Sequence, residues 1–302
     1  MSKLKAFASF VLAATFVPAL FAEAHCPGHV ASLPFTLTNH GLIVVEVSVD
    51  HSGPYNFLLD TGDQITILDS ALAVELQLET QDTARSVGVG LHVDAAVAHP
   101  GLLGVGSHAA TIPMALVFDL HNRQSGDVPI RGILGEDFLG QFDLLIDNAH
   151  HFVCLDDKAA MRADVKGTHV AVTTPAQIEN GLRLPSLLIV AVRLSGGASP
   201  VRLQLDSGAN GSVLFNTPRY MVQFSHASLR GRTADGTQQT FSVLPPQSVR
   251  VGSLELREVS FVSLPDAQNG SHSKEFDGVL TTALFRRVFI DHANSSVVLE
   301  AW

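Results

Sequence analysis

Two aspartates lie in nearly identical turns, each directly behind an apolar run. The first turn reads Asp60-Thr61-Gly62 and the second reads Asp206-Ser207-Gly208, and the two aspartates are 146 residues apart. Two carboxyl groups that face each other can share one proton, so that one acts as a base and the other as an acid on a single water molecule. We therefore take Asp60 and Asp206 as the candidate catalytic pair.

The same spacing recurs elsewhere in the chain. Residues 66–68 match residues 212–214 and Gly132 matches Gly278 at this offset, while Ile146-Asp147 matches Ile290-Asp291 at an offset of 144. The sequence thus reads as an internal duplication. A duplication places equivalent aspartates on either side of a local two-fold axis, as a symmetric dimer would.

Short strands are the elements that must position these turns. Apolar side chains alternate with polar ones at residues 45–49, a pattern typical of a half-buried strand, and residues 187–194 begin the second half in the same way. Residues 70–78 have helical character. The expected divisions are a signal peptide over residues 1–24, a first lobe over 25–157, a polar, helix-compatible linker over 158–183 and a second lobe over 184–302.

The residues beside each aspartate have structural tasks. Glycine permits the tight turn and leaves an N–H group free to approach the carboxylate. The Thr61 and Ser207 hydroxyls can form hydrogen bonds across the pair and hold the two turns together. The residues expected to shape the site are Thr61, Gly62, Asp63, Ser207, Gly208 and Ala209.

With these motifs the chain resembles the retropepsin-like and pepsin-like aspartic proteases, in their bacterial exported form. An apolar-apolar-glycine element braces each turn in that family, and residues 132–135 followed by Asp137-Phe138-Leu139, together with residues 278–280, fit it. The resemblance implies an all-β, bilobal fold of two duplicated retropepsin-like β-barrel lobes with a cleft between them. It also implies an aspartic endopeptidase that hydrolyses peptide bonds with a water activated by the two aspartates, without a metal or other cofactor.

A peptide or protein substrate would lie extended in the cleft, under glycine-bearing hairpins that match the family's flap. Neither hairpin carries the tyrosine of pepsin-like flaps, which favours the retropepsin-like side, and either could instead be an ordinary tight hairpin. The flap candidates are Val87, Gly88, Val89 and Gly90 in the first half and Thr233, Ala234, Asp235 and Gly236 in the second.

Asp63 departs from the family pattern, which usually has alanine or serine after the glycine; the matching residue in the second half is Ala209. A third carboxylate beside the pair could suppress activity or shift the pH optimum upward, unless its side chain turns away. The alternative function is accordingly a non-catalytic peptide-binding protein of the cell envelope, a pseudoprotease.

The N-terminus reads as a signal peptide. Lys3 and Lys5 precede an apolar stretch over residues 6–21, and small residues flank Glu23 as a signal peptidase requires, so we expect cleavage after Ala24 and export to the periplasm or the medium. An uncleaved anchor is the rival interpretation. In an exported chain, Cys26 and Cys154 could form a disulfide or remain two separate thiols.

The remaining features restrict the partners. The net charge of −10 argues against nucleic acid, and no segment after the signal peptide is apolar enough to span a membrane. His25 and His29 lie near Cys26 but lack matching ligands elsewhere, so we expect no metal site. Because both aspartates belong to one chain, a monomer suffices for the site.

Overall fold

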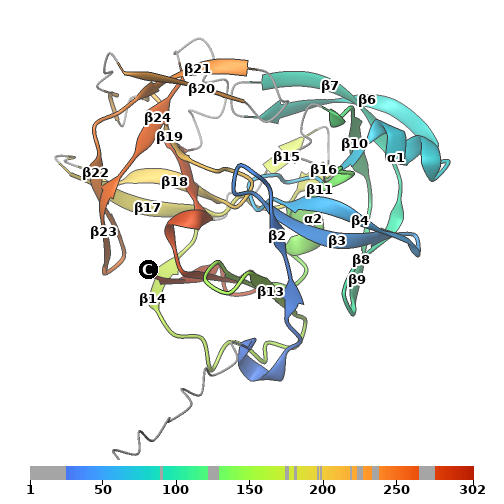
Figure 1. Cartoon of the computed structure of the whole chain (residues 1–302), viewed down its shortest axis with the longest axis horizontal. Coiled ribbons are helices and arrows are strands. Elements are labelled where there is room, and N and C mark those ends of the chain that lie inside the picture. The colour runs from blue at the N-terminus through green and yellow to red at the C-terminus, as the bar shows by residue number, and fades with distance from the viewer. Residues whose placement is uncertain are drawn as a thin grey trace, which may run out of the picture.

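The structure is a computed structural model of the chain. It describes residues 25–88, 91–121, 129–173, 177–179, 182–195, 197, 199–217, 220–222, 227–232, 238–264 and 276–302. Strands dominate this part of the chain. They form two large sheets side by side, a six-stranded sheet below them and a small two-stranded sheet (Figure 1). The proposed signal peptide, residues 1–24, lies outside the described residues and stays a prediction.

The first half of the chain builds one large sheet. Its strands are β2 (Thr36–Leu37), β3 (Ile43–Val49), β4 (Ser52–Leu59), β5 (Ile67–Asp69), β6 (Thr80–Gly88), β7 (Leu91–Ala98), β8 (Gly101–Val105), β9 (His108–Ile112), β10 (Ala115–Phe118) and β11 (Gly132–Leu134). Their order is β6-β7-β10-β5-β11-β4-β3-β8-β9, and β2 pairs with β3.

The second half repeats this sheet. Its strands are β17 (Ile189–Leu194), β18 (Val201–Asp206), β19 (Ser212–Leu214), β20 (Ser228–Arg232), β21 (Gln238–Val243), β22 (Gln247–Val251), β23 (Leu254–Val259), β24 (Phe261–Ser263) and β25 (Gly278–Thr281). Their order, β20-β21-β24-β19-β25-β18-β17-β22-β23, matches that of the first sheet strand for strand, apart from β2. The predicted all-β fold of two duplicated lobes is confirmed.

Both halves contribute to the six-stranded sheet, which we call the shared sheet. Its strands are β1 (Leu33–Pro34), β12 (Asp143–Asp147), β13 (Phe152–Asp156), β14 (Thr168–Ala171), β26 (Arg287–Asp291) and β27 (Ser296–Glu300), in the order β1-β13-β12-β26-β27-β14. At its centre β12 runs antiparallel to β26 with Leu145 opposite Phe289. These two residues are equivalent in the duplication, so the local two-fold axis passes between them.

Apolar side chains from both lobes and the shared sheet form one continuous core. Val47 of β3, Leu144 of β12, Val190 of β17 and Val288 of β26 all belong to it and are fully buried. The alternation predicted at residues 45–49 is confirmed, because Val45, Val47 and Val49 are buried while Glu46 is exposed. Burial of this surface is the main force that holds the lobes together.

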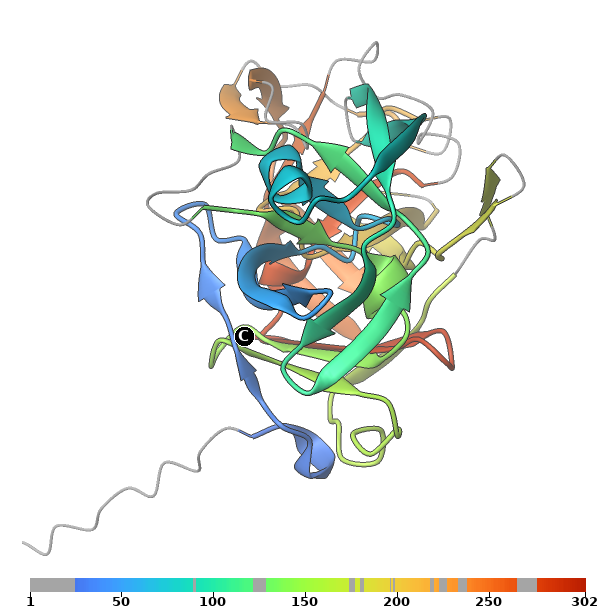
Figure 2. The same ribbon diagram turned by 90° about the vertical axis from the view of Figure 1, so that its right-hand side faces the viewer.

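Helices are short and few in the described residues. They are α1 (Ser70–Glu75), α2 (Glu136–Leu139) and the 3₁₀ turns η1 (Pro27–His29) and η5 (Thr282–Leu284). Helix α1 lies in the segment that was expected to be helical, and Figure 2 shows it in front of the first sheet. Its buried residues Leu72 and Ala73 anchor it there.

The segment expected to be a helix-compatible linker, residues 158–183, contains strands instead. Strand β14 pairs with β27 and completes the shared sheet, and β15 (Gln177–Glu179) forms a hairpin with β16 (Leu182–Leu184). Val170 is buried while its neighbours His169 and Ala171 are exposed, a strand-like alternation. Pairing with β27 thus overrides the local helix preference.

The two cysteines form a disulfide. Cys26 and Cys154 lie 5.9 Å apart at their Cα atoms, so the bond attaches the segment around η1 to β13 of the shared sheet. Within the described residues no group of three or more His, Cys, Asp or Glu side chains could hold a metal ion. In this same part of the chain, no helix has the length and apolar character needed to cross a membrane.

Candidate active site

Each candidate aspartate lies at the carboxyl end of an inner strand. Asp60 directly follows β4, and its N–H group donates to the Leu134 carbonyl of the parallel strand β11 at 3.0 Å. Asp206 is the last residue of β18 and lies opposite Thr281 of the parallel strand β25. Buried strands on both sides therefore fix the backbone at each aspartate.

Backbone N–H groups orient each carboxylate. Gly62 and Asp63 donate to Asp60 Oδ1 at 2.8 and 3.2 Å, and Gly208 donates to Asp206 Oδ1 at 2.7 Å. These bonds leave the second oxygen of each carboxylate directed toward the other turn. Both aspartates are consequently held by their own turns before any substrate is present.

The Thr61 and Ser207 hydroxyls cross between the two turns in a symmetric pattern. Thr61 Oγ1 donates to the Leu205 carbonyl at 3.2 Å and accepts from the Ser207 N–H group at 3.1 Å. Ser207 Oγ donates to the Leu59 carbonyl at 2.8 Å and accepts from the Thr61 N–H group at 3.0 Å. We call this set of four hydrogen bonds the hydroxyl bridge.

The two glycines bring the carboxylates face to face. A Cβ atom added to Gly62 would lie 2.5 Å from Asp206 Cγ, and one added to Gly208 would overlap the Asp60 carboxylate. Asp60 is buried and Asp206 is partly buried, and their side chains share a hydrogen bond. Only residues without a side chain allow each turn to pack against the opposite carboxylate.

This arrangement favours one retained proton. Burial raises the pKa of Asp206 well above its ordinary value, and the charges of Asp60 and Asp63 raise it further, against the opposing effect of the Gly208 N–H group. Two carboxylates this close cannot both ionise at low cost, so the pair titrates as one unit. The site thus offers one acid and one base at the same place.

A family model described as aspartyl protease matches residues 45–138. This range begins in β3, contains the Asp60 turn and ends in α2, and the second half repeats the same elements around Asp206. The segment around Asp60 thus matches the aspartyl protease family, whose substrates are peptides.

Two solved structures align with the chain. The crystal structure of edgp aligns with a TM-score of 0.48 and 11% identity, over 92% of this chain and 96% of that one. A retropepsin-like aspartic protease from Rickettsia conorii aligns with a TM-score of 0.32 and 16% identity, over 42% of this chain and 93% of its own. No curated protein sequence matches the chain.

Helix α2 braces the Asp60 turn from behind. The Asp137 carboxylate accepts hydrogen bonds from Thr66 Oγ1 at 2.6 Å and from the Thr66 N–H group at 2.9 Å. Burial raises the pKa of Asp137 to about 6, against the lowering effect of the Thr66 hydrogen bonds. The Glu136 N–H group donates to the Asp63 carbonyl at 2.8 Å. Helix α2 therefore holds the segment that leaves Asp60.

The second lobe braces its turn differently. Ala283 replaces Asp137 at the matching position, and Thr281 replaces Gly135. Thr281 Oγ1 donates to the Ala209 carbonyl at 2.5 Å and accepts from the Ala283 N–H group at 3.3 Å. The threonine hydroxyl thus takes over the bracing task, and β25 keeps its regular register with β18.

Asp63 lies beside the candidate catalytic pair. Its charge contributes to the raised pKa of Asp206, and its N–H and carbonyl groups bind Asp60 and Glu136. Its side chain is partly exposed. The third carboxylate is consequently near enough to act on the pair, while Ala209 contributes only backbone.

Some cross-lobe contacts had no signal in the sequence. Gln204 Nε2 donates to the Gly62 carbonyl at 2.7 Å, and Gln64 Nε2 donates to the Pro185 carbonyl. Gln204 is buried although it is polar. A polar residue inside the apolar run before Asp206 is the one signal that could have indicated its role.

The flap candidates are only partly described. Val87 and Gly88 end β6, which pairs with β7 up to Gly88 opposite Leu91, as in a hairpin. Val89, Gly90 and the second set, Thr233, Ala234, Asp235 and Gly236, lie outside the described residues. Strands β20 and β21 pair up to Arg232 opposite Gln238 on either side of that second set. The substrate-binding role of both sets stays a prediction.

Proposed function

We propose that the chain is an aspartic endopeptidase in which Asp60 and Asp206 activate a water molecule. The observation that carries the proposal is the face-to-face packing of the two carboxylates, each against the glycine of the opposite turn. The hydrogen bond between the side chains and the raised pKa of Asp206 support a shared proton. Neighbouring turns and buried strands hold both groups rigidly, as a pre-organised site requires.

The reaction needs only these two groups and water. The ionised aspartate takes a proton from the water molecule while the water oxygen attacks the peptide carbonyl carbon. The protonated aspartate gives its proton to the carbonyl oxygen. A tetrahedral diol results. As its C–N bond breaks, the proton taken from the water passes to the departing amine, and one diol hydroxyl returns its proton to the other aspartate, which restores the starting pair. Neither a covalent intermediate nor a cofactor takes part.

The substrate would be an extended peptide lying between the lobes, with its backbone paired to strand edges. Both aspartates come from one chain, so a monomer provides the complete pair. Export to the periplasm or the medium is part of the proposal, supported by the N-terminal segment and by the disulfide.

Cleavage of denatured casein by residues 25–302, measured from acid to neutral pH, tests the proposal. We expect activity that rises below neutral pH and is lost with a statine-type inhibitor. Asp60→Asn and Asp206→Asn should each lower kcat/KM by at least about 10²–10⁴-fold, because each removes one partner in proton transfer. Equal cleavage by wild type and both variants would exclude the pair as the catalyst.

A non-catalytic peptide-binding protein is the second candidate, and the position of Asp63 favours it. A third negative charge beside the pair raises the pKa of Asp206. If it also kept Asp60 protonated, the pair would have no base. Such a protein, correctly folded, would bind peptides and cleave none at any pH. Cleavage gained by Asp63→Ala would then show that this carboxylate suppresses the reaction.

A further inference from the structure

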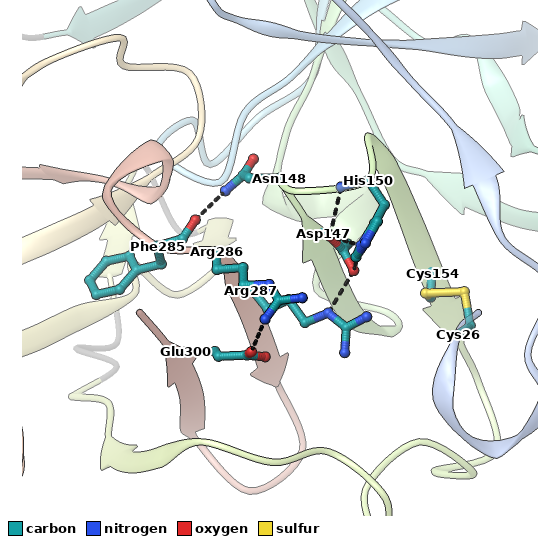
Figure 3. Close-up of polar contacts among 9 residues, drawn as sticks. All are labelled: Cys26, Asp147, Asn148, His150, Cys154, Phe285, Arg286, Arg287 and Glu300. Atoms are coloured by element: carbon teal, nitrogen blue, oxygen red, sulfur yellow. Dashed lines mark hydrogen bonds and ion pairs between the residues drawn. A yellow bond between two sulfur atoms is a disulfide. The ribbon is translucent and has the colours of Figure 1, made fainter. Parts of the chain in front are cut away.

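Equivalent turns of the shared sheet cross to the opposite lobe and reach the bracing element behind its aspartate. In the turn after β12, Asn148 Nδ2 donates to the Phe285 carbonyl beside η5 at 3.0 Å (Figure 3). It also donates to the Thr282 carbonyl in η5 at 3.1 Å. The equivalent residue after β26 is His292. Its Nδ1 lies 2.6 Å from the Phe142 carbonyl oxygen, and its Nε2 lies 2.9 Å from Glu136 Oε2 in α2.

The two crossings differ in their need for a proton. The Asn148 amide nitrogen carries two hydrogens and can bind two carbonyls at any pH. The Phe142 carbonyl only accepts, so His292 Nδ1 must carry a hydrogen. A second proton must then lie between His292 Nε2 and Glu136 Oε2, bound to one of these two atoms. Without it, two lone pairs would face each other and repel. Both contacts of His292 therefore persist only while this extra proton is bound.

The histidine crossing is enclosed on most sides. The side chains of His292 and Glu136 are 12% and 2% exposed, and Glu136 Oε1 has no hydrogen-bond partner among the described residues. A carboxylate in such a place is costly without a nearby positive charge. Loss of the extra proton would leave Glu136 charged, buried and unpaired.

Other charged groups face the pair, within α2 and from the neighbouring elements. In α2, burial raises the pKa of Asp137 to about 6, and the charge of Glu136 contributes to this rise. Asp143 of β12 and Asp291 of β26 both pair with Arg162. His292 also borders a cavity of about 450 Å³ whose charged lining residues are Asp143, Asp156, Asp157, Lys158 and Arg162. Arg162 offsets part of the acidic surroundings, and the cavity gives protons a route to the histidine.

We propose that His292 and Glu136 form a proton-dependent clasp that positions the turn of Asp60. The link is α2, in which the Glu136 N–H group holds the Asp63 carbonyl at 2.8 Å and the Asp137 N–H group holds the Gln64 carbonyl at 3.1 Å. The second lobe has the same crossing in a form that needs no extra proton. The catalytic consequence of the clasp rests on the proposed function, whereas its effect on stability does not.

The pH range of the clasp follows from its charges. Burial lowers the pKa of His292, but Glu136, the Phe142 carbonyl and Asp143 outweigh this effect, and the pKa is raised from the ordinary 6.5. A raised pKa means that the clasp stabilises the folded state fully below pH 6.5 and loses this contribution as the pH rises through the folded value. If the proposed function holds, protease activity would decline over the same rise in pH, because the clasp would no longer position the turn of Asp60.

Glu136→Gln is the decisive variant. The side-chain amide that this substitution introduces can donate to a neutral His292 Nε2, so both contacts of the histidine survive without the extra proton. Asn148→Ala is the matched control, because it removes the other crossing and no titrating group. The purified protein in an Asp60→Asn background is melted from about pH 5 to about pH 9, and His292 is titrated by ¹⁵N NMR.

The parent is the Asp60→Asn protein without a further substitution. As the pH rises, we expect its melting temperature to fall by roughly 2–4 °C or more relative to that of the Glu136→Gln variant. Asn148→Ala should lower it by a similar amount at every pH. Parallel curves for the parent and Glu136→Gln, or a neutral His292 ring beside an ionised Glu136 in the parent at about pH 6, would overturn the proposal. If Glu136→Gln does not fold, the NMR titration of the parent decides alone.

The proposed function is tested separately. In the protein that retains Asp60, the Glu136→Gln variant should keep its full kcat up to a higher pH than the wild type does. Its KM should change little. Absence of cleavage by both proteins, together with the expected melting and NMR results, would reject the proposed function and keep the clasp.

Discussion

At the scale of single residues, Asp63 is the largest departure from symmetry at the site. Its counterpart is Ala209, so the first turn brings a negative charge that the second lacks. This charge adds to burial and to Asp60 in raising the pKa of Asp206. The retained proton of the pair is consequently bound more tightly than the turns alone would bind it.

Asp63→Ala should move the alkaline limb of the pH–activity profile to lower pH. Removal of a neighbouring negative charge lowers the pKa of Asp206, so the pair loses its shared proton at a lower pH. The measurement is kcat/KM for a synthetic peptide across the pH range, with Asp63→Glu as the control that keeps the charge. An alkaline limb that stays in place or moves upward would contradict the role given to Asp63.

The sequence predicted the aspartates and their glycines because adjacent residues within each turn carry that signal. The clasp had no such signal, since His292 and Glu136 are 156 residues apart. Glu136 reads as an ordinary acidic residue in the first turn of a helix. It is buried only because the shared sheet brings the His292 turn over it, which depends on the complete fold.

At the scale of elements, the hydroxyl bridge joins the ends of β4 and β18. Its donors are the hydroxyl and N–H groups of Thr61 and Ser207, both almost fully buried. The Leu59 and Leu205 carbonyls accept from the two hydroxyls. Buried polar groups that lose their partners cost free energy without compensation from water. The bridge therefore couples the two lobes at the point where their carboxylates meet.

Thr61→Val should lower the free energy of unfolding by about 1–3 kcal/mol, because the Leu205 carbonyl and the Ser207 N–H group both lose a partner. Thr61→Ser keeps the hydroxyl and should retain most of that stability. Urea unfolding in the Asp60→Asn background measures both. Equal losses in the two variants would assign the effect to the methyl group rather than to the bridge.

Strand patterns in the sequence were sufficient to predict the lobes but not every element. Alternating residues such as Val45 and Val47 mark a strand locally. By contrast, residues 168–171 form β14 through pairing with β27, more than a hundred residues along the chain. Sheet membership of this kind depends on long-range partners, which local propensity does not contain.

At the scale of the whole molecule, the disulfide attaches the start of the described chain to the shared sheet. Cys26 and Cys154 close a loop across a sequence separation of 128 residues. The loop contains the first large sheet, β12 and the start of β13. Closing a long loop removes many unfolded conformations. The bond should stabilise the first lobe more than its small local contacts suggest.

Cys26→Ser should lower the free energy of unfolding by about 2–5 kcal/mol. Chemical denaturation with and without a reducing agent measures this effect, and the reduced wild type should resemble the variant. Cys26→Ser/Cys154→Ser serves as the control for a single unpaired thiol. Unchanged unfolding of the wild type under full reduction would show that the bond contributes no stability.

The pairing of β12 with β26 has an evolutionary consequence. Leu144 lies opposite Ile290 and Ile146 opposite Val288, so each strand meets the other's equivalent residues in mirrored order about Leu145 and Phe289. A shorter ancestral gene that encoded one lobe could have used this edge to join two identical copies, with one Asp-Thr/Ser-Gly turn from each. Gene fusion would then have freed each copy to diverge, and Asp63, Thr281 and His292 are the kinds of one-sided change that a homodimer could not have acquired.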